Sequence, residues 1–377
     1  MRQYHDLLKR VLGEGEVQFE PRTREYIIGV SNAPVSTYNL DDGFPLVTTK
    51  NVPIRLPGEE LLWKLRGERN VKPLVDKDVN IWTANAFDRY LVKNGLTEKF
   101  PKHSAGWNRE FEKYSGRIKT DADFAREAGD LGPVYGYQWR RWRKPVFVPG
   151  HSVGSEWNPQ EWRVEEIDQL ANLIKGIKEK PGSRYHILSA WNPADLGEMA
   201  LGPCPFWHQF TVYGKNLDLT TVQRSADVFL GVPFNIAQDA LLLQLIANET
   251  GLMPRKFSHI PINTHAYLGV PPRTDFWENP FNVKKFQDRF RKISERKQYL
   301  ELKEDYLGWA GRESDEDKGK DHTPFILEQL SKEPRDLPEV NVTDSPLLEL
   351  IEMPIGEVIT IKGYDPHKWN SKAVMAT

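Results

Sequence analysis

The sequence contains a single cysteine, Cys204, among its 377 residues. One cysteine excludes an intrachain disulfide framework and a zinc site built from several cysteines. The chain also has no run of about 18 apolar residues, so it offers no candidate for a membrane-spanning helix. Its first fifteen residues lack the apolar stretch of a signal peptide. These absences lead us to expect a cytoplasmic protein that needs no membrane.

An excess of charge of either sign is also missing. The 51 basic and 53 acidic residues give a formal net charge of −2. Such a balance provides no global attraction to nucleic acid or to an anionic membrane, so we expect neither as a partner. Hydrophobic residues make up 39% of the chain, with 12 Trp, 13 Tyr and 17 Phe. This composition is typical of a globular protein with a large core.

The spacing of apolar residues predicts both helices and strands. One helix begins near Tyr4 and is expected to stop at Gly13 and Gly15. Further helices are predicted over 58–67, over 165–180 with a stripe of Ile167, Leu170, Ile174 and Ile177, and over 234–251, which is apolar enough to be buried. Strands are predicted over 25–30, 184–191, 256–267 and 357–364, and a strand pair flanks Gly214-Lys215. Because these elements lack a regular βαβ rhythm, we expect an α+β fold with a mixed or antiparallel sheet.

Three stretches differ in composition from the rest of the chain. Residues 86–130 are polar and helix-like, 144–163 are rich in Pro, Gly and Ser, and 296–336 are heavily charged. We interpret all three as insertions, and we expect their charges to form a solvated surface.

Cys204 lies between two prolines in "ALGPCPFWHQF" and allows two interpretations. A lone cysteine is often a small buried hydrophobe. As a nucleophile it would need nearby positive charge, which Arg184 or Arg224 could supply. A hydrolase would also need a positioned histidine, and His208 is four residues away. On a strand those two side chains share a face but lie too far apart for a direct hydrogen bond, so a Cys–His hydrolase has little support.

Other polar residues suggest small-molecule chemistry. Glu60 lies on an apolar helix stripe, where a carboxyl group is either paired or able to exchange protons near neutral pH. Arg224 and Ser225, in "QRSADVFLGVPFNIA", have the charge and hydroxyl that bind phosphate. Asn235 carries both a donor and an acceptor and suits the edge of a pyrimidine. By themselves these spacings only suggest a nucleotide site.

Taken together, the motifs resemble the thymidylate synthase superfamily. They occur in the family's order: "MRQYHDLLKRVLGEG", "DGFPLVTTK", "EELLWKLRG", "NIWTAN", "LGPVYGYQW", "SAWNPADLGEMAL", "PCPFWHQF", "QRSADVFLGVPFNIA", "THAY" and "KGYDPH". The resemblance covers most of the chain outside the three insertions. It implies a thymidylate synthase-like α+β fold in one catalytic domain over 1–377.

The resemblance also implies a reaction and its residues. The family joins C5 of a pyrimidine deoxynucleotide to the one-carbon unit of 5,10-methylenetetrahydrofolate, without a metal. Cys204 then resembles the nucleophile that adds to C6 of the ring. The other implied catalytic residues are Glu60, Tyr135, Arg224 and Asp227. The implied contacts to phosphate and sugar are Arg22, Arg184, Arg224, Ser225, His265 and Tyr267. Folate is expected beside Lys50, Trp82, Asp227, Gly231, Phe234 and the C-terminal tail.

Two of these similarities have further implications. Arg184 is similar to an arginine that reaches the partner's phosphate, which implies a homodimer. Asn235 is similar to the asparagine of members that act on uracil, whereas deoxycytidylate hydroxymethylases have aspartate there. Asparagine can donate to uracil O4 and accept from N3–H, so the expected substrate is dUMP.

The chain departs from the family's pattern around the expected ring and phosphate. Pro205 follows the cysteine where synthases have histidine, and Tyr185 replaces a second arginine after Arg184. Arg22 lies in an altered turn, "PRTREY", and Ile262-Asn263 replaces Gly-Asp. Phage-type deoxyuridylate hydroxymethylases diverge in this way. We therefore expect that water completes the reaction to give 5-hydroxymethyl-dUMP and tetrahydrofolate. The alternatives are a thymidylate synthase that makes dTMP and dihydrofolate, and an inactive nucleotide-binding relative.

Overall fold

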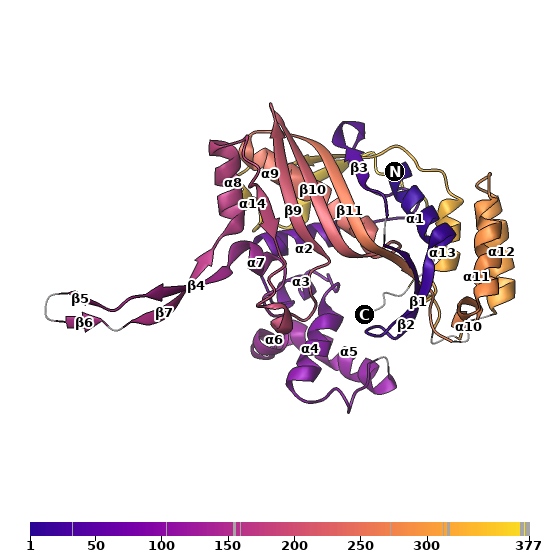
Figure 1. The fold of residues 1–377 in the computed structure, drawn as a ribbon, viewed down its shortest axis with the longest axis horizontal. Coiled ribbons are helices and arrows are strands. Elements are labelled where there is room, and N and C mark those ends of the chain that lie inside the picture. The colour runs from indigo at the N-terminus through magenta and orange to yellow at the C-terminus, as the bar shows by residue number, and fades with distance from the viewer. Residues whose placement is uncertain are drawn as a thin grey trace. The chain divides into compact units, whose positions relative to one another are not determined.

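The computed structural model describes residues 1–31, 33–102, 104–153, 156–158, 160–271, 273–311, 313–314, 317–369 and 373. These residues form two compact units, Met1–Gly58 with Phe210–Thr377, and Glu59–Gln209. Figure 1 labels their elements. Most of the C-terminal tail that was expected to contact folate lies outside the described residues.

The first unit is built around a mixed sheet, as the sequence predicts. β1 (Glu16–Glu20) pairs antiparallel with β2 (Glu25–Val30), and β2 pairs antiparallel with the end of β11 (Met253–Tyr267). β10 (Asn216–Asp227) runs parallel to β11, which places Asp227 beside His265. β3 (Ser36–Asn39) pairs with the other end of β11. Because β10 and β11 end together, polar side chains of both strands gather at one edge of the sheet.

Two helices of this unit show how well local patterns predict structure. α9 (Gly231–Thr250) is buried along most of its length, as an apolar sequence requires, and it ends at Gly251 with a φ of 68°. α1 (Arg2–Glu14) buries Tyr4 and the apolar stripe that follows it. The prediction that Gly13 stops this helix was wrong. Gly13 lies within the last turn, and the helix ends at Gly15.

The other elements of the first unit are mostly short helices. They are η1 (Leu40–Asp42), α10 (Arg273–Glu278), α11 (Pro280–Arg291), α12 (Gln298–Ala310), α13 (Thr323–Leu330), β12 (Glu339–Val342), α14 (Leu347–Leu350), α15 (Ile355–Val358) and β13 (Ile359–Lys362). β12 pairs antiparallel with β13.

The second unit begins with helices. They are α2 (Arg55–Leu65, which starts in the first unit), α3 (Lys72–Val75), α4 (Thr83–Lys93), α5 (Ala105–Thr120) and α6 (Ala122–Ala128). The ring of Phe87 lies 5.2 Å from that of Trp107 and 5.0 Å from that of Tyr114. The expectation of a merely solvated surface over 86–130 was therefore wrong in part, because these helices enclose an aromatic core of their own.

A β-ribbon includes the Pro-, Gly- and Ser-rich stretch over 144–163 that we interpreted as an insertion. β4 (Trp142–Val148) pairs antiparallel with β7 (Glu161–Ile167), and β5 (His151–Val153) pairs with β6 (Glu156–Asn158). The four strands extend away from α7 and α8 (Figure 1). Because β7 takes up residues to Ile167, the helix predicted over 165–180 begins later, as α8 (Gln169–Glu179). Its buried stripe is Leu170, Leu173 and Ile177.

The remaining elements of this unit lie on either side of the cysteine in sequence. They are α7 (Gly136–Arg140), β8 (Ile187–Ser189), η2 (Leu196–Glu198) and β9 (Pro205–Tyr213), whose last residues belong to the first unit. β8 pairs antiparallel with the start of β9, with Leu188 opposite His208. No helix among the described residues of either unit is long and apolar enough to span a bilayer.

Candidate active site

Cys204 lies at a bend directly before β9 and is partly exposed. Its backbone N–H donates to Tyr135 Oη at 2.7 Å. Pro203 and Pro205 on either side are buried. Since proline fixes the backbone φ angle, the two prolines restrict the bend that presents the thiol. His208 packs edge-on against Trp139, with 5.2 Å between the ring centroids, and is buried.

Tyr135 has an unusual backbone conformation for a residue other than glycine. Its φ is 32°, in the left-handed half of conformational space. Such strain costs on the order of 1–3 kcal/mol, and it persists only where the surroundings impose it. Gly136, which follows, lets α7 approach α2 closely: a Cβ built there would lie 1.8 Å from the Lys64 carbonyl oxygen. The close approach of the two helices therefore holds the phenol beside Cys204.

Three side chains of the second unit converge beside Tyr135. Glu60 Oε1 accepts a hydrogen bond from Trp82 Nε1 at 2.9 Å and lies 3.0 Å from Lys64 Nζ. Lys64 Nζ lies 4.3 Å from the centre of the Tyr135 ring, over its face. The Trp82 ring meets the Tyr135 ring edge-on at 5.5 Å. All four side chains are buried. A carboxylate in this position has one oxygen held by a cation and an indole.

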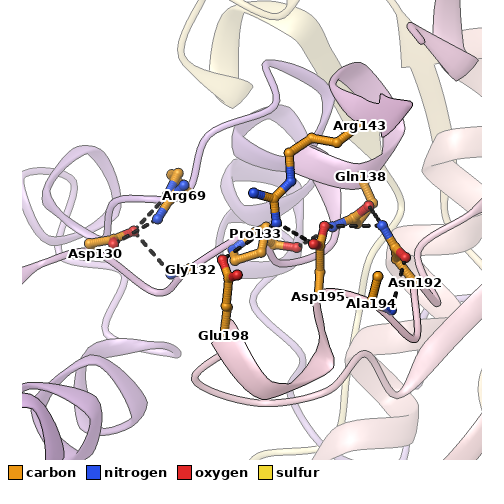
Figure 2. Close-up of polar contacts among 10 residues, drawn as sticks. All are labelled: Arg69, Asp130, Gly132, Pro133, Gln138, Arg143, Asn192, Ala194, Asp195 and Glu198. Atoms are coloured by element: carbon orange, nitrogen blue, oxygen red, sulfur yellow. Dashed lines mark hydrogen bonds and ion pairs between the residues drawn. The ribbon is translucent and has the colours of Figure 1, made fainter. Parts of the chain in front are cut away.

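A polar network supports the loops that carry Tyr135 and Cys204. The buried carboxylate of Asp195 accepts hydrogen bonds from Gln138 Nε2 at 2.7 Å and Asn192 Nδ2 at 3.0 Å, and it pairs with Arg143 (Figure 2). Because Gln138 belongs to α7, the network ties the segment around η2 to the helix that follows Tyr135.

A second group of polar residues lies at the ends of β10 and β11 in the first unit. Asp227 Oδ1 accepts backbone hydrogen bonds from Phe229 at 2.9 Å and Leu230 at 3.2 Å, just before α9 begins at Gly231. The ammonium of Lys50 donates to the Phe229 carbonyl oxygen and lies 3.9 Å from the centre of the Phe229 ring. Burial lowers the pKa of Lys50 to about 7, although the Asp227 charge acts against this shift.

His265 and Tyr267 extend this group along β11. Their rings meet edge-on at 5.3 Å. Burial lowers the pKa of His265 and raises that of Tyr267, and the Arg22 charge acts on both. Arg22 itself lies half-exposed in the turn between β1 and β2, 3.9 Å from Glu20. A neutral imidazole beside a protonated phenol suits hydrogen bonding to hydroxyl groups.

Asn235, on the first turns of α9, has its amide oriented by a neighbour. Its Oδ1 accepts a hydrogen bond from Gln223 Nε2 at 3.1 Å. Gln223 Oε1 in turn lies 2.8 Å from His259 Nε2, so both ends of the glutamine side chain are held. With Oδ1 turned towards Gln223, the Asn235 amide nitrogen remains to donate to a ligand.

Comparison with known proteins shows the family to which the chain belongs. The thymidylate synthase family model matches residues 2–377. This chain belongs to the thymidylate synthase family. It is 42% identical over 278 residues to a thymidylate synthase of Listeria monocytogenes serotype 4a (strain HCC23), which covers 71% of this chain and 82% of the relative. A thymidylate synthase of Listeria innocua has the same identity and coverage, and one of Mesoplasma florum is 40% identical over 269 residues. A subtype of phage hydroxymethylases is not supported by these relatives.

Against this family background, several predicted site residues are found together and others are not. Glu60, Trp82, Tyr135 and Cys204 form one contiguous group. The predicted site residues of the first unit are Arg22, Lys50, Arg224, Ser225, Asp227, Gly231, Phe234, Asn235, His265 and Tyr267. Arg224 and Ser225 lie on β10 and are partly exposed, as is Phe234 on α9. Arg184 is exposed in the loop before β8. The homodimer and the three insertions stay predictions.

Three residues in or beside these groups were missed by sequence reasoning. Lys64 is one turn after Glu60 on α2, and this i,i+4 spacing was a readable signal of an ion pair. Gln223 and His322 had none, because their partners are distant in sequence. His322 lies in 296–336, where we expected a solvated surface, yet it is fully buried and its Nδ1 is 3.8 Å from Asp227 Oδ1. That expectation was wrong for Asp321, His322 and Thr323. Among the described residues, no cluster of histidine, cysteine and carboxylate side chains could hold a metal ion.

Proposed function

We propose that the protein is a thymidylate synthase, which converts dUMP to dTMP with 5,10-methylenetetrahydrofolate as the one-carbon and hydride donor. The observation that carries the proposal is the family match over 2–377, with relatives named thymidylate synthase at 42% identity over most of their length. The group around Cys204 supports it, because a thiol, a phenol and a carboxylate suit addition to a ring and proton removal.

The covalent step is assigned to Cys204. Its thiolate adds to C6 of the pyrimidine, so that C5 becomes nucleophilic and bonds to the one-carbon unit. Arg224 and Ser225 are the proposed phosphate contacts, through charge-assisted hydrogen bonds. They are one residue apart on β10, so their side chains point to opposite faces of the strand, and the backbone must twist to bring both to one phosphate.

Proton transfer at the ring is assigned to Tyr135 and Glu60. The phenol oxygen of Tyr135 is held by the backbone N–H of Cys204, the residue that bonds to C6. Trp82 and Lys64 hold Glu60 through Oε1, and this fixed carboxylate is the group proposed to orient water or exchange a ring proton. We further propose that Asp227, Lys50, Trp82, Gly231 and Phe234 contact the folate.

Hydroxymethylation of dUMP is a second candidate, favoured by Pro205 alone. Proline follows the nucleophile directly and provides neither a side-chain donor nor a backbone N–H. If the hydrogen-bond network beside the ring is weaker there, water can intercept the exocyclic methylene before hydride reaches it. The product would then be 5-hydroxymethyl-dUMP with tetrahydrofolate.

One experiment separates these functions. The purified protein is incubated with dUMP and 5,10-methylenetetrahydrofolate, the nucleotide is identified by mass spectrometry and the folate by its absorbance. The proposal expects dTMP and dihydrofolate in equal amounts. 5-Hydroxymethyl-dUMP with tetrahydrofolate would support the second candidate, and no product with intact dUMP binding would indicate an inactive relative. Cys204→Ser is the control: it should bind dUMP but give no product.

The choice of uracil is tested at Asn235. Asn235→Asp replaces the proposed O4 donor by a group that matches cytosine only when protonated. We expect the ratio of kcat/KM for dUMP to that for dCMP to fall by on the order of 10²-fold, because a polar group left unpaired with the wrong base is costly. An unchanged ratio would remove Asn235 from substrate discrimination.

A further inference from the structure

Lys64 holds a central position in the group around Cys204. It is 3% exposed and forms a 3.0 Å ion pair with Glu60, one turn earlier on α2. The same ammonium lies over the Tyr135 ring at 4.3 Å from its centre. Tyr135 in turn accepts the Cys204 N–H. One buried cation therefore touches both groups to which proton transfer is assigned.

We infer that Lys64 is a positioning residue for the proton transfers of the reaction. Its ammonium holds Glu60 Oε1 and so fixes the orientation of the carboxylate to which proton exchange with water or the ring is assigned. Its place over the Tyr135 ring fixes that phenol against Cys204. This inference rests on the proposed function.

Physical reasoning favours this role over a purely structural one. A buried ion pair contributes little net stability, because the desolvation of both charges offsets most of their attraction. An apolar side chain at position 64 would fill the space beside the Tyr135 ring without the desolvation cost of a charge. A lysine here instead fixes the position of a positive charge and the orientation of the Glu60 carboxylate. The attraction between a cation and an aromatic face is stronger when both are desolvated, so the buried ammonium helps to hold the orientation of the Tyr135 ring.

The test compares kcat, KM and dUMP affinity of the wild type, Lys64→Met and Lys64→Arg. Lys64→Met keeps the length and volume but removes the charge. We expect its kcat to fall by about 10- to 100-fold, less than the roughly 10²- to 10⁴-fold contribution of a positioned acid–base group itself, while KM and Kd for dUMP change less than about twofold. Lys64→Arg keeps the charge and should recover kcat to within about fivefold of the wild type.

A double-mutant cycle shows whether Lys64 acts through Glu60. In a Glu60→Gln background, Lys64→Met should lower kcat by less than about threefold, since the group that it positions is already disabled. Lys77→Met is the matched control. Lys77 pairs at 2.6 Å with Glu59, the residue before Glu60 on α2. Its loss therefore removes a neighbouring ion pair and should leave kcat unchanged.

The outcomes distinguish the two proposals. If the wild type forms no product from dUMP, the proposed function fails and the role of Lys64 fails with it. If the wild type is active and Lys64→Met keeps its kcat, Lys64 is not a positioning residue. The same conclusion follows if kcat falls but Lys64→Arg gives no recovery, or if the loss is equally large in the Glu60→Gln background. A lower melting temperature with kcat preserved would mark Lys64 as structural.

Discussion

The substitution Gly136→Ala tests whether the close approach of α7 and α2 sets the position of Tyr135. An added Cβ would lie 1.8 Å from the Lys64 carbonyl oxygen, and real Cβ atoms essentially never lie closer than 3.0 Å to such an atom. The helices must therefore separate by about 1.2 Å, the difference between these distances. The three atoms nearest to this Cβ are all backbone atoms of Lys64, so no side-chain rotation relieves the clash.

The consequences follow from the size of that shift. Overpacking of this kind costs about 1–3 kcal/mol of folding free energy. A displacement near 1 Å of a catalytic group lowers activity by on the order of 10²-fold, and Tyr135 is the residue directly before Gly136. Thermal unfolding and steady-state kinetics of dTMP formation measure the two effects. We expect a lower melting temperature together with a kcat reduced about 100-fold.

A matched control uses a glycine of the same unit with free space around it. A Cβ on Gly116, in the middle of α5, meets no atom within 4 Å. Gly116→Ala should therefore stabilise the protein by about 0.5–1 kcal/mol and leave kcat unchanged, because alanine loses less backbone entropy in a helix. If Gly136→Ala melts and turns over like the wild type, the close approach is not what positions Tyr135.

Further predictions concern pH and the polar network. Burial raises the pKa of Glu25 to about 7 in the folded protein, so the native state binds a proton that the unfolded chain has released above about pH 4.5. The contribution of Glu25 is therefore fully present below pH 4.5 and is lost as pH rises through 7. Glu25→Gln should match the wild type near pH 4 and exceed its stability by roughly 3 kcal/mol at pH 8; equal pH–stability curves would contradict this. Asp195→Asn places an amide donor opposite the side-chain donors of Gln138 and Asn192. It should lower the free energy of unfolding by about 2–3 kcal/mol. Because the Asp195 network supports the loop that carries Cys204, the sole cysteine, the rate of thiol alkylation should also rise in Asp195→Asn. Asp123→Asn changes an exposed ion pair and should alkylate like the wild type.

Local sequence patterns predicted the elements whose buried residues can be identified from their own residue types and spacing. The strand over 25–30 and the buried helix α9 follow from residue type and period alone. The start of α8 could not be predicted in this way. Residues 165–167 continue a helical period in sequence, but they pair with β4 as part of a strand. An element's boundary thus depends on a partner about twenty residues away, which no local pattern records.

The residues of the candidate site also fall into those that local patterns identify and those that depend on distant partners. Motif order identified Glu60, Tyr135 and Cys204, and spacing could have shown that Lys64 follows Glu60 by one turn. The orientation of Asn235 depends on Gln223, and the burial of His322 on packing against Phe229, with 5.3 Å between ring centroids. Charge density alone suggested that the segment around His322 was solvated, because composition does not reveal which polar residues find buried partners.

The amino-acid sequence by itself determined the chemical inventory: one thiol, an acid on an apolar helix, an asparagine suited to a pyrimidine, and the ordered motifs that carry them. Tertiary structure alone decided how these groups are held. The contact of Cys204 with Tyr135 joins residues 69 positions apart. It depends on the strained backbone of Tyr135 and on a glycine that lets two helices touch. Such geometry arises from close packing between distant segments, where a single Cβ is enough to move a catalytic group, and therefore could not be read from any one stretch of the chain.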